Sequence, residues 1–130
     1  MTSPARRDDG MSKADIALLL TFIASYDQRT IGATDVEAWH LVARPGRWTL
    51  PYARRAVVEH ATNATGDRLL PGHITKRIRE QRRHFAGTYR HTDIPRELVG
   101  DIAAELDWED RQRAAHVATC MDAWARGEVA

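Results

Sequence analysis

The side chains best suited to catalysis or metal binding are one cysteine and six histidines, and they are scattered along the chain. His116 and Cys120 stand four residues apart, a spacing that puts two side chains on one face of a helix. No second pair at zinc-ligand spacing accompanies them, so the sequence predicts no metal site. Because Cys120 lies among Val117, Met121 and Trp124, we expect a buried, unreactive thiol.

Motifs for enzymatic chemistry are absent from the sequence. It contains no phosphate-binding glycine loop, no nucleophile elbow and no HExxH motif. The neighbouring carboxylates Asp35 and Glu37 are explained as residues that begin a helix. We therefore expect that the protein is not an enzyme, uses no cofactor and works by binding other macromolecules.

Basic side chains are concentrated in the middle of the chain, where residues 67–92 hold seven basic and two acidic residues. In a helix that turns about 100° per residue, Lys76, Arg79 and Arg83 share one side, opposite Ile74. Such a stripe is suited to contact nucleic-acid phosphates, although an acidic protein partner or simple solvation also explains it. The candidate nucleic-acid-binding residues are Arg68, Lys76, Arg77, Arg79, Arg82 and Arg83.

The C-terminal segment has the opposite charge, with nine acidic and four basic residues over 93–130. Its apolar residues recur at helical spacing, and those from Ala114 to Trp124 resemble the seam of a coiled coil. Two interpretations of this helix are open. If it detaches, its large apolar side chains would anchor it in a groove of a partner protein; if it packs back, they would complete the core formed by the preceding helices. The candidate partner-binding residues are Leu98, Ile102, Leu106, Trp108, Val117, Met121 and Trp124.

Helix signals define the elements that must position these groups. Capping boxes at 12–15 and 34–37 predict two helix starts, and Pro51 and Pro71 each stand in the first turn of a further helix. No segment alternates with period two, so no strand is predicted. We predict an all-α fold, a small bundle of four helices with a C-terminal helical arm. Its parts are a flexible tail over 1–11, a helical domain over 12–85, a linker over 86–94 and a C-terminal helical region over 95–127.

Length and composition limit the class of protein further. The 130 residues are 43% hydrophobic and 28% charged, which suits one domain with one modest core. A single cysteine excludes an intramolecular disulfide, and no apolar run approaches the roughly 20 residues that cross a bilayer. The first ten residues lack the apolar stretch of a signal peptide. We expect a cytoplasmic protein that does not bind membranes.

Three stretches of the sequence resemble the phage replicative-helicase loaders, the loader-and-inhibitor family of phages that carry their own replication module. Residues 16–26 are similar to the family's first helix, which ends in a tyrosine, and residues 34–41 to its short tryptophan helix. Residues 50–60, followed by 69–74, resemble its third helix and proline-led fourth. The resemblance covers about the first two-thirds of the chain.

The resemblance implies a function in the cytoplasm of the bacterial host. A member of this family binds the hexameric replicative helicase, restrains its ATPase and loads it onto origin DNA, with DNA or a replication initiator as a further partner. In the family the C-terminal part is the mobile one that engages the helicase, which corresponds here to residues 94–124.

Three alternatives remain open from the sequence. One is a small DNA-binding regulator that uses the third and fourth helices. Another is a host-directed phage protein that inhibits a bacterial target by protein–protein binding. The last is a structural oligomer paired through the apolar seam of the C-terminal helix, since the sequence leaves the oligomeric state open.

Overall fold

The computed structural model describes residues 10–63 and 67–129. Over these residues the chain forms helices and no strands, which confirms the all-α prediction. None of the helices in these two ranges is both long and apolar enough to span a bilayer. The elements are α1 (Lys13–Asp27), α2 (Ala33–Ala43), α3 (Leu50–Thr62), α4 (Pro71–Thr88), the short 3-10 helix η2 (Arg96–Leu98) and α5 (Ile102–Ala125).

The first predicted capping box is present at the start of α1. The Ser12 hydroxyl accepts a hydrogen bond from the Asp15 backbone N–H at 3.1 Å, and the Asp15 carboxylate accepts one from the Ser12 N–H at 3.2 Å. Most of the predicted tail over 1–11 lies outside the described residues. Its last member, Met11, is described and is buried in the core.

The second helix begins earlier than the predicted box at Thr34 indicates. Its N-cap is Gly32, and the Asp35 carboxylate accepts a hydrogen bond from the Gly32 N–H at 2.8 Å. Asp35 therefore performs the task that the sequence assigned to Glu37, because it stands three residues after the true N-cap. The starts of α3 and α4 carry their prolines in the first turn, as predicted.

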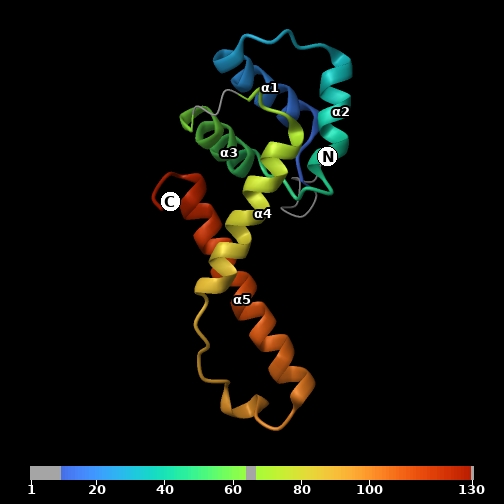
Figure 1. The fold of residues 1–130 in the computed structure, drawn as a ribbon. Coiled ribbons are helices and arrows are strands. Elements are labelled where there is room, and N and C mark those ends of the chain that lie inside the picture. The colour runs from blue at the N-terminus through green and yellow to red at the C-terminus, as the bar shows by residue number, and fades with distance from the viewer. Residues whose placement is uncertain (1–9, 64–66, 130) are drawn as a thin grey trace.

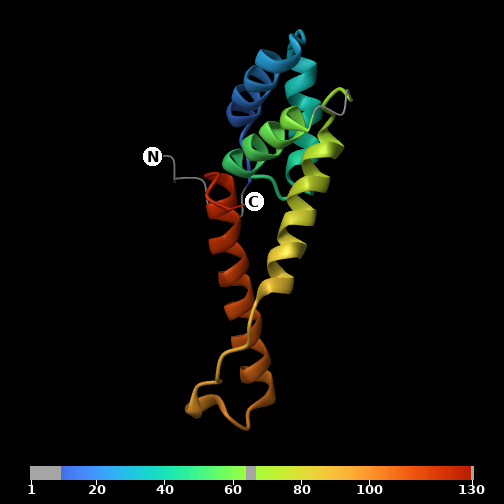
Figure 2. The ribbon, with the colours of Figure 1, turned by 60° about the vertical axis from the view of Figure 1, so that its left-hand side comes forward.

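Two parts of the molecule differ in shape. The first three helices and the beginning of α4 form a compact body, and α4 and α5 run side by side away from it (Figure 1, Figure 2). The far half of α5 and the connection over 89–101 extend beyond the body. We call this extension, residues 89–113, the arm.

The near half of α5 is part of the core. Met121 and Trp124 are 1% and 0% exposed and belong to the same hydrophobic cluster as the helices of the body. The Trp124 indole N–H donates a hydrogen bond to the Glu59 carboxylate at 3.0 Å, and the Tyr52 hydroxyl donates one to Asp122 at 2.7 Å. Of the two interpretations of the C-terminal helix, packing back therefore describes this half.

The region predicted as a linker over 86–94 begins inside a helix. α4 continues to Thr88, with Gly87 in its last turn, and the connection to α5 runs from Tyr89 to Asp101 through η2. The end of α4 is tied to α5 because the Thr88 hydroxyl lies 2.9 Å from His116 Nε2. α5 ends at Ala125, and Gly127, with φ of +76°, follows its cap residue Arg126.

A core residue that the sequence analysis missed lies between α2 and α3. Trp48 is fully buried, its indole N–H donates a hydrogen bond to the Thr75 hydroxyl at 2.9 Å, and its ring packs against Trp39 at a centroid distance of 6.1 Å. The turn over residues 44–47 brings Trp48 into the core. The hydrogen bond from Trp48 to Thr75 and the one from Arg82 to the Arg47 carbonyl oxygen hold this turn against α4.

Candidate functional site

Large apolar side chains are exposed together at the end of the arm. Val99, Ile102 and Leu106 are 65%, 71% and 61% exposed. Ile102 and Leu106 are one helical turn apart on α5, and Val99 lies three residues before Ile102. We call these three residues the arm tip. Two of them were predicted as partner-binding residues, and Val99 was missed because it lies in a loop without helical spacing.

The arm tip is exposed because, among the described residues, no helix lies beside it. By helical spacing, Ile102 and Leu106 continue the face of α5 that buries Trp124 against the body. α4 ends at Thr88, which contacts His116, so the helical partner of α5 stops before this face reaches the tip. The apolar face of α5 is therefore longer than the body that covers it.

The other predicted partner-binding residues lie in three different environments. Leu98 and Trp108 are half-buried within the arm, and Val117 is half-buried against the core. Met121 and Trp124 are sealed inside the body, so they are not available at a surface in this structure. Burial in the core corrects the prediction for these last two, because their contacts are already made within the chain.

Acidic residues surround the arm tip. Residues 93–110 contain seven carboxylates and one basic residue, Arg96. Glu97 and Asp101 are exposed, and Asp101 also caps α5 by accepting a hydrogen bond from the Ala104 N–H at 3.1 Å. Asp107 is exposed too, but it forms an ion pair with Arg111 at 2.8 Å. The surface at the end of the arm thus combines an apolar centre with a negative edge.

The basic residues of α4 divide into two groups. Lys76, Arg79 and Arg83 are exposed along one side of the helix, as predicted. Arg77 lies 3.9 Å from Glu59 and is mostly buried, so it contacts the body rather than solvent.

Arg82 also turns toward the body. Its guanidinium donates a hydrogen bond to the Arg47 carbonyl oxygen at 2.8 Å and lies 5.6 Å from the centre of the Tyr52 ring. Burial lowers the pKa of the Arg82 guanidinium, and the positive charge of Arg47 lowers it further. Arg77 and Arg82 are thus structural contacts in this fold, and the exposed stripe is narrower than the sequence predicted.

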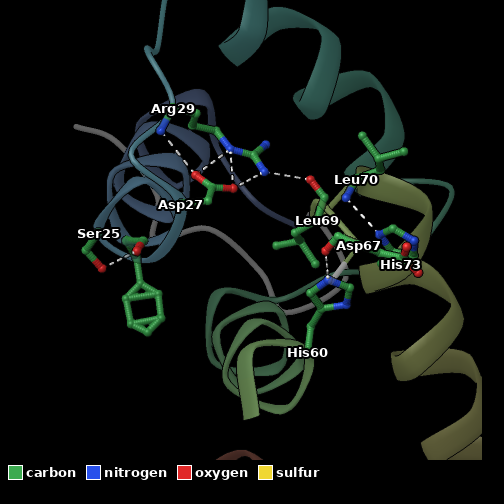
Figure 3. A network of polar contacts seen from close by, with 9 residues as sticks. Ser25, Asp27, Arg29, His60, Asp67, Leu69, Leu70 and His73 are labelled. Carbon is green, nitrogen blue, oxygen red and sulfur yellow. Dashed lines mark hydrogen bonds and ion pairs between the residues drawn. The ribbon is translucent and has the colours of Figure 1, made fainter. Parts of the chain in front are cut away.

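A polar network joins the end of α1 to the segment before α4 (Figure 3). Arg29 forms an ion pair with Asp27 and donates a hydrogen bond to the Leu69 carbonyl oxygen at 2.7 Å. The hydrogen bond from Arg29 holds the pKa of the Asp27 carboxyl below its usual value, and the charge of the exposed Arg68 acts in the same direction. Arg68 therefore lies near this network, apart from the stripe on α4.

Two histidines complete this region. His60 Nε2 lies 2.8 Å from the Asp67 carbonyl oxygen, and His73 Nδ1 accepts a hydrogen bond from the Leu70 N–H at 2.8 Å (Figure 3). An open pocket lies beside His60, and Asp27 and Arg29 also line it. The contacts of these three residues with neighbouring segments help to hold the segment before α4.

The remaining reactive groups form no larger cluster. Cys120 Sγ lies 3.7 Å from His116 Nε2. The prediction was a buried thiol, whereas Cys120 is half-buried in the structure. Within residues 10–63 and 67–129, no group of three or more metal-ligating side chains is close enough to hold an ion. The two exposed features described above are surfaces: the arm tip and the basic side of α4.

Comparison of the chain with protein-family models, curated proteins and solved structures finds no match. The resemblance to helicase loaders thus stays a prediction from the sequence.

Proposed function

We propose that the protein is an adaptor that grips a partner protein with the arm tip, and that this partner is the hexameric replicative helicase of a phage-type replication system. The adaptor restrains the helicase and loads it onto DNA in the cytoplasm of the bacterial host. The observation that carries the proposal is the exposure of Val99, Ile102 and Leu106 at the end of a projecting helix.

The energetic argument concerns the water-exposed apolar surface of the tip. Full burial of a side chain of this size is worth about 1.5–3 kcal/mol, and these three retain more than half of their surface exposed. A partner groove that covers all three would gain several times RT from this term. Contiguous exposed apolar surface on a soluble domain is typical of a binding site.

The charge around the tip selects the kind of partner. A negative edge attracts a groove with a basic rim and speeds the encounter with it. The same charge repels an anionic membrane and a second copy of the arm, because both carry like charge. We therefore expect an apolar groove edged by Lys or Arg on the helicase.

The identity of the helicase as partner follows from the family resemblance, which assigns helicase contact to the C-terminal part of the chain. We propose a contact at a different place within that part from the one predicted. Since Met121 and Trp124 are buried in the body, the surface we propose uses Ile102 and Leu106 from the predicted set together with Val99.

The test is co-elution of the full-length protein with a replicative helicase hexamer on size exclusion. We expect the wild-type protein to co-elute and Leu106→Asp to elute alone, because a carboxylate at the tip costs desolvation in an apolar groove. Leu41→Asp is the matched control, since Leu41 is 72% exposed on α2, away from the arm. Equal co-elution of Leu106→Asp and wild type would contradict the role of the tip.

A host-directed inhibitor would use the same surface on a different protein. In that case the wild-type protein does not co-elute with the helicase, and an affinity column bearing it retains another bacterial protein that a Leu106→Asp column does not. This result would contradict the helicase as the partner but would support the arm tip as the surface that binds a protein.

A further inference from the structure

Two segments far apart in the sequence meet on one side of the body. The turn over residues 44–47 lies against α4, because Arg82 donates a hydrogen bond to the Arg47 carbonyl oxygen and Trp48 donates one to Thr75. The approach is close: a Cβ added at Gly46 would lie 2.7 Å from the Thr75 hydroxyl. The turn is thus held in a fixed position on the helix.

This contact adds two cations to the stripe on α4. Arg79 stands one turn after Thr75 and one turn before Arg82, so it lies on the helix surface next to both residues that hold the turn. Arg44 and Arg47 of the turn are exposed. The positive charge of Arg47 acts on the Arg82 guanidinium and helps to lower its pKa.

We call the exposed cations of the two segments the two-element basic surface: Arg44, Arg47, Lys76, Arg79 and Arg83. In the described part of the chain, none of these five side chains has a carboxylate within ion-pair distance. By contrast, Arg77 lies near Glu59, and Arg111 and Arg113 of α5 pair with carboxylates of their own helix. The charge of the two-element basic surface is therefore available to a ligand.

We propose that the two-element basic surface binds the phosphate backbone of nucleic acid, independently of the contact that the arm tip makes. Arg83 stands seven positions after Lys76, about 10.5 Å along the helix, which is close to the axial span of four consecutive phosphates, three steps of about 3.4 Å, in one strand of a duplex. Four of the five side chains are arginines, whose planar forks suit phosphate oxygens.

The contacts are to phosphates, so binding is independent of base sequence and depends strongly on salt. The buried side of α4 holds the exposed side rigid, because Ile74 and Ile78 are fully buried. Cations on a fixed helix lose little backbone freedom on binding, compared with cations on a mobile tail.

The experiment is fluorescence anisotropy of the full-length protein with a labelled single strand and a labelled duplex, each about 30 nucleotides long. Salt is varied from about 50 to 200 mM to obtain the slope of log K against log salt. We expect binding to both probes. Since each lost phosphate contact lowers the magnitude of the slope by about 1, Arg79→Ala/Arg83→Ala lowers it by about 2 and Arg47→Ala by about 1.

Arg96→Ala is the matched control for Arg47→Ala, because Arg96 is an exposed arginine on the arm and each substitution removes one positive charge. Absence of nucleic-acid binding, or equal weakening by Arg96→Ala, would overturn the proposal. An unchanged slope with Arg47→Ala would confine the site to α4 and overturn its two-element form.

Two further measurements separate nucleic acid from other anions. Competition by polyglutamate as strong as that by unlabelled nucleic acid, at equal charge concentration, would assign the surface to an acidic protein. Flotation with vesicles of about 30% phosphatidylserine that depends on Arg79 and Arg83 would assign it to an anionic membrane. We expect neither result. Far-UV circular dichroism of each variant shows whether the helices are intact.

Discussion

At the scale of single residues, Asp27 shows how one ion pair holds two segments. Its partner Arg29 is almost completely buried and also donates to the Leu69 carbonyl oxygen, so this contact fixes the segment that leads into α4. Leu69 itself is buried in the core. The position of α4, and thus of its exposed basic side, depends in part on this guanidinium.

The pKa of Asp27 gives this contact a pH dependence. Because the folded state lowers this pKa, the carboxylate stabilises the fold at neutral pH, and that contribution is lost as the pH falls through the lowered value. We expect Asp27→Asn to be less stable than wild type at neutral pH and the difference to shrink under acidic conditions. Urea unfolding of both proteins across acidic and neutral pH measures this. A difference that stays constant down to strongly acidic pH would show that the charge of Asp27 contributes nothing.

At the scale of elements, the docking of α5 rests on Trp124. Its indole fills the space between α3 and α5 and donates a hydrogen bond to Glu59, which also lies near Arg55 and Arg77. Without this side chain the near half of α5 would lose its largest contact with the body. The arm would then lose the support that fixes its direction.

Trp124→Ala is expected to lower the free energy of unfolding by about 3–5 kcal/mol, the cost of removing a buried aromatic side chain. Trp108→Ala is expected to cost less, because Trp108 is half-buried within the arm. Urea unfolding followed by circular dichroism measures both. Should Trp124→Ala not fold, Trp124→Phe keeps the ring volume in part and loses the bond to Glu59, at a cost of about 1–3 kcal/mol. Equal effects at positions 108 and 124 would contradict the docking of α5.

Elements and their ends were largely predictable from the sequence, because the signals are local. The Ser12–Asp15 capping box, the first-turn prolines and the apolar spacing of α1 each act within a few residues. The difference between the predicted and observed start of α2 has a local cause too. Asp35 and Glu37 both suit the first turn of a helix, but only Asp35 stands three residues after the N-cap Gly32.

The candidate surfaces were predictable only in part, because they depend on contacts between distant segments. Helical spacing identified Lys76, Arg79 and Arg83, but it could not show that Arg82 turns inward to Arg47. Helical spacing likewise placed Leu106 and Trp124 on the same apolar face, although Leu106 is exposed and Trp124 is buried. The two residues differ in burial because α4 ends before it reaches Leu106. The spacing of apolar residues in α5 carries no information about where α4 ends.

At the scale of the whole molecule, the two surfaces lie on different parts and carry opposite charge. The two-element basic surface lies on α4 and on the turn before α3, whereas the arm tip with its acidic edge lies at the far end of α5 (Figure 2). This separation allows one chain to hold a negatively charged polymer and a basic-rimmed protein at the same time, without competition between them.

The separation predicts that the two binding activities can be removed one at a time. Leu106→Asp should lose the protein partner and keep nucleic-acid binding, whereas Arg79→Ala/Arg83→Ala should do the reverse. Both assays are run on both variants at one salt concentration, with unfolding free energies as the check on folding. If either variant lost both activities while its stability was unchanged, the two surfaces would be one.

The continuity of α5 has a mechanical consequence. Its 24 residues form a rod of about 36 Å that begins at the exposed tip and ends at the sealed indole of Trp124. A load applied to the far end by a large, moving assembly is therefore delivered to the contacts of the near half of α5 with α3 and α4 as a bending moment. Such a load would strain the contact between His116 and Thr88 and the bond between Trp124 and Glu59, so the strength of the grip depends on the anchoring of the rod as well as on the contact at its tip.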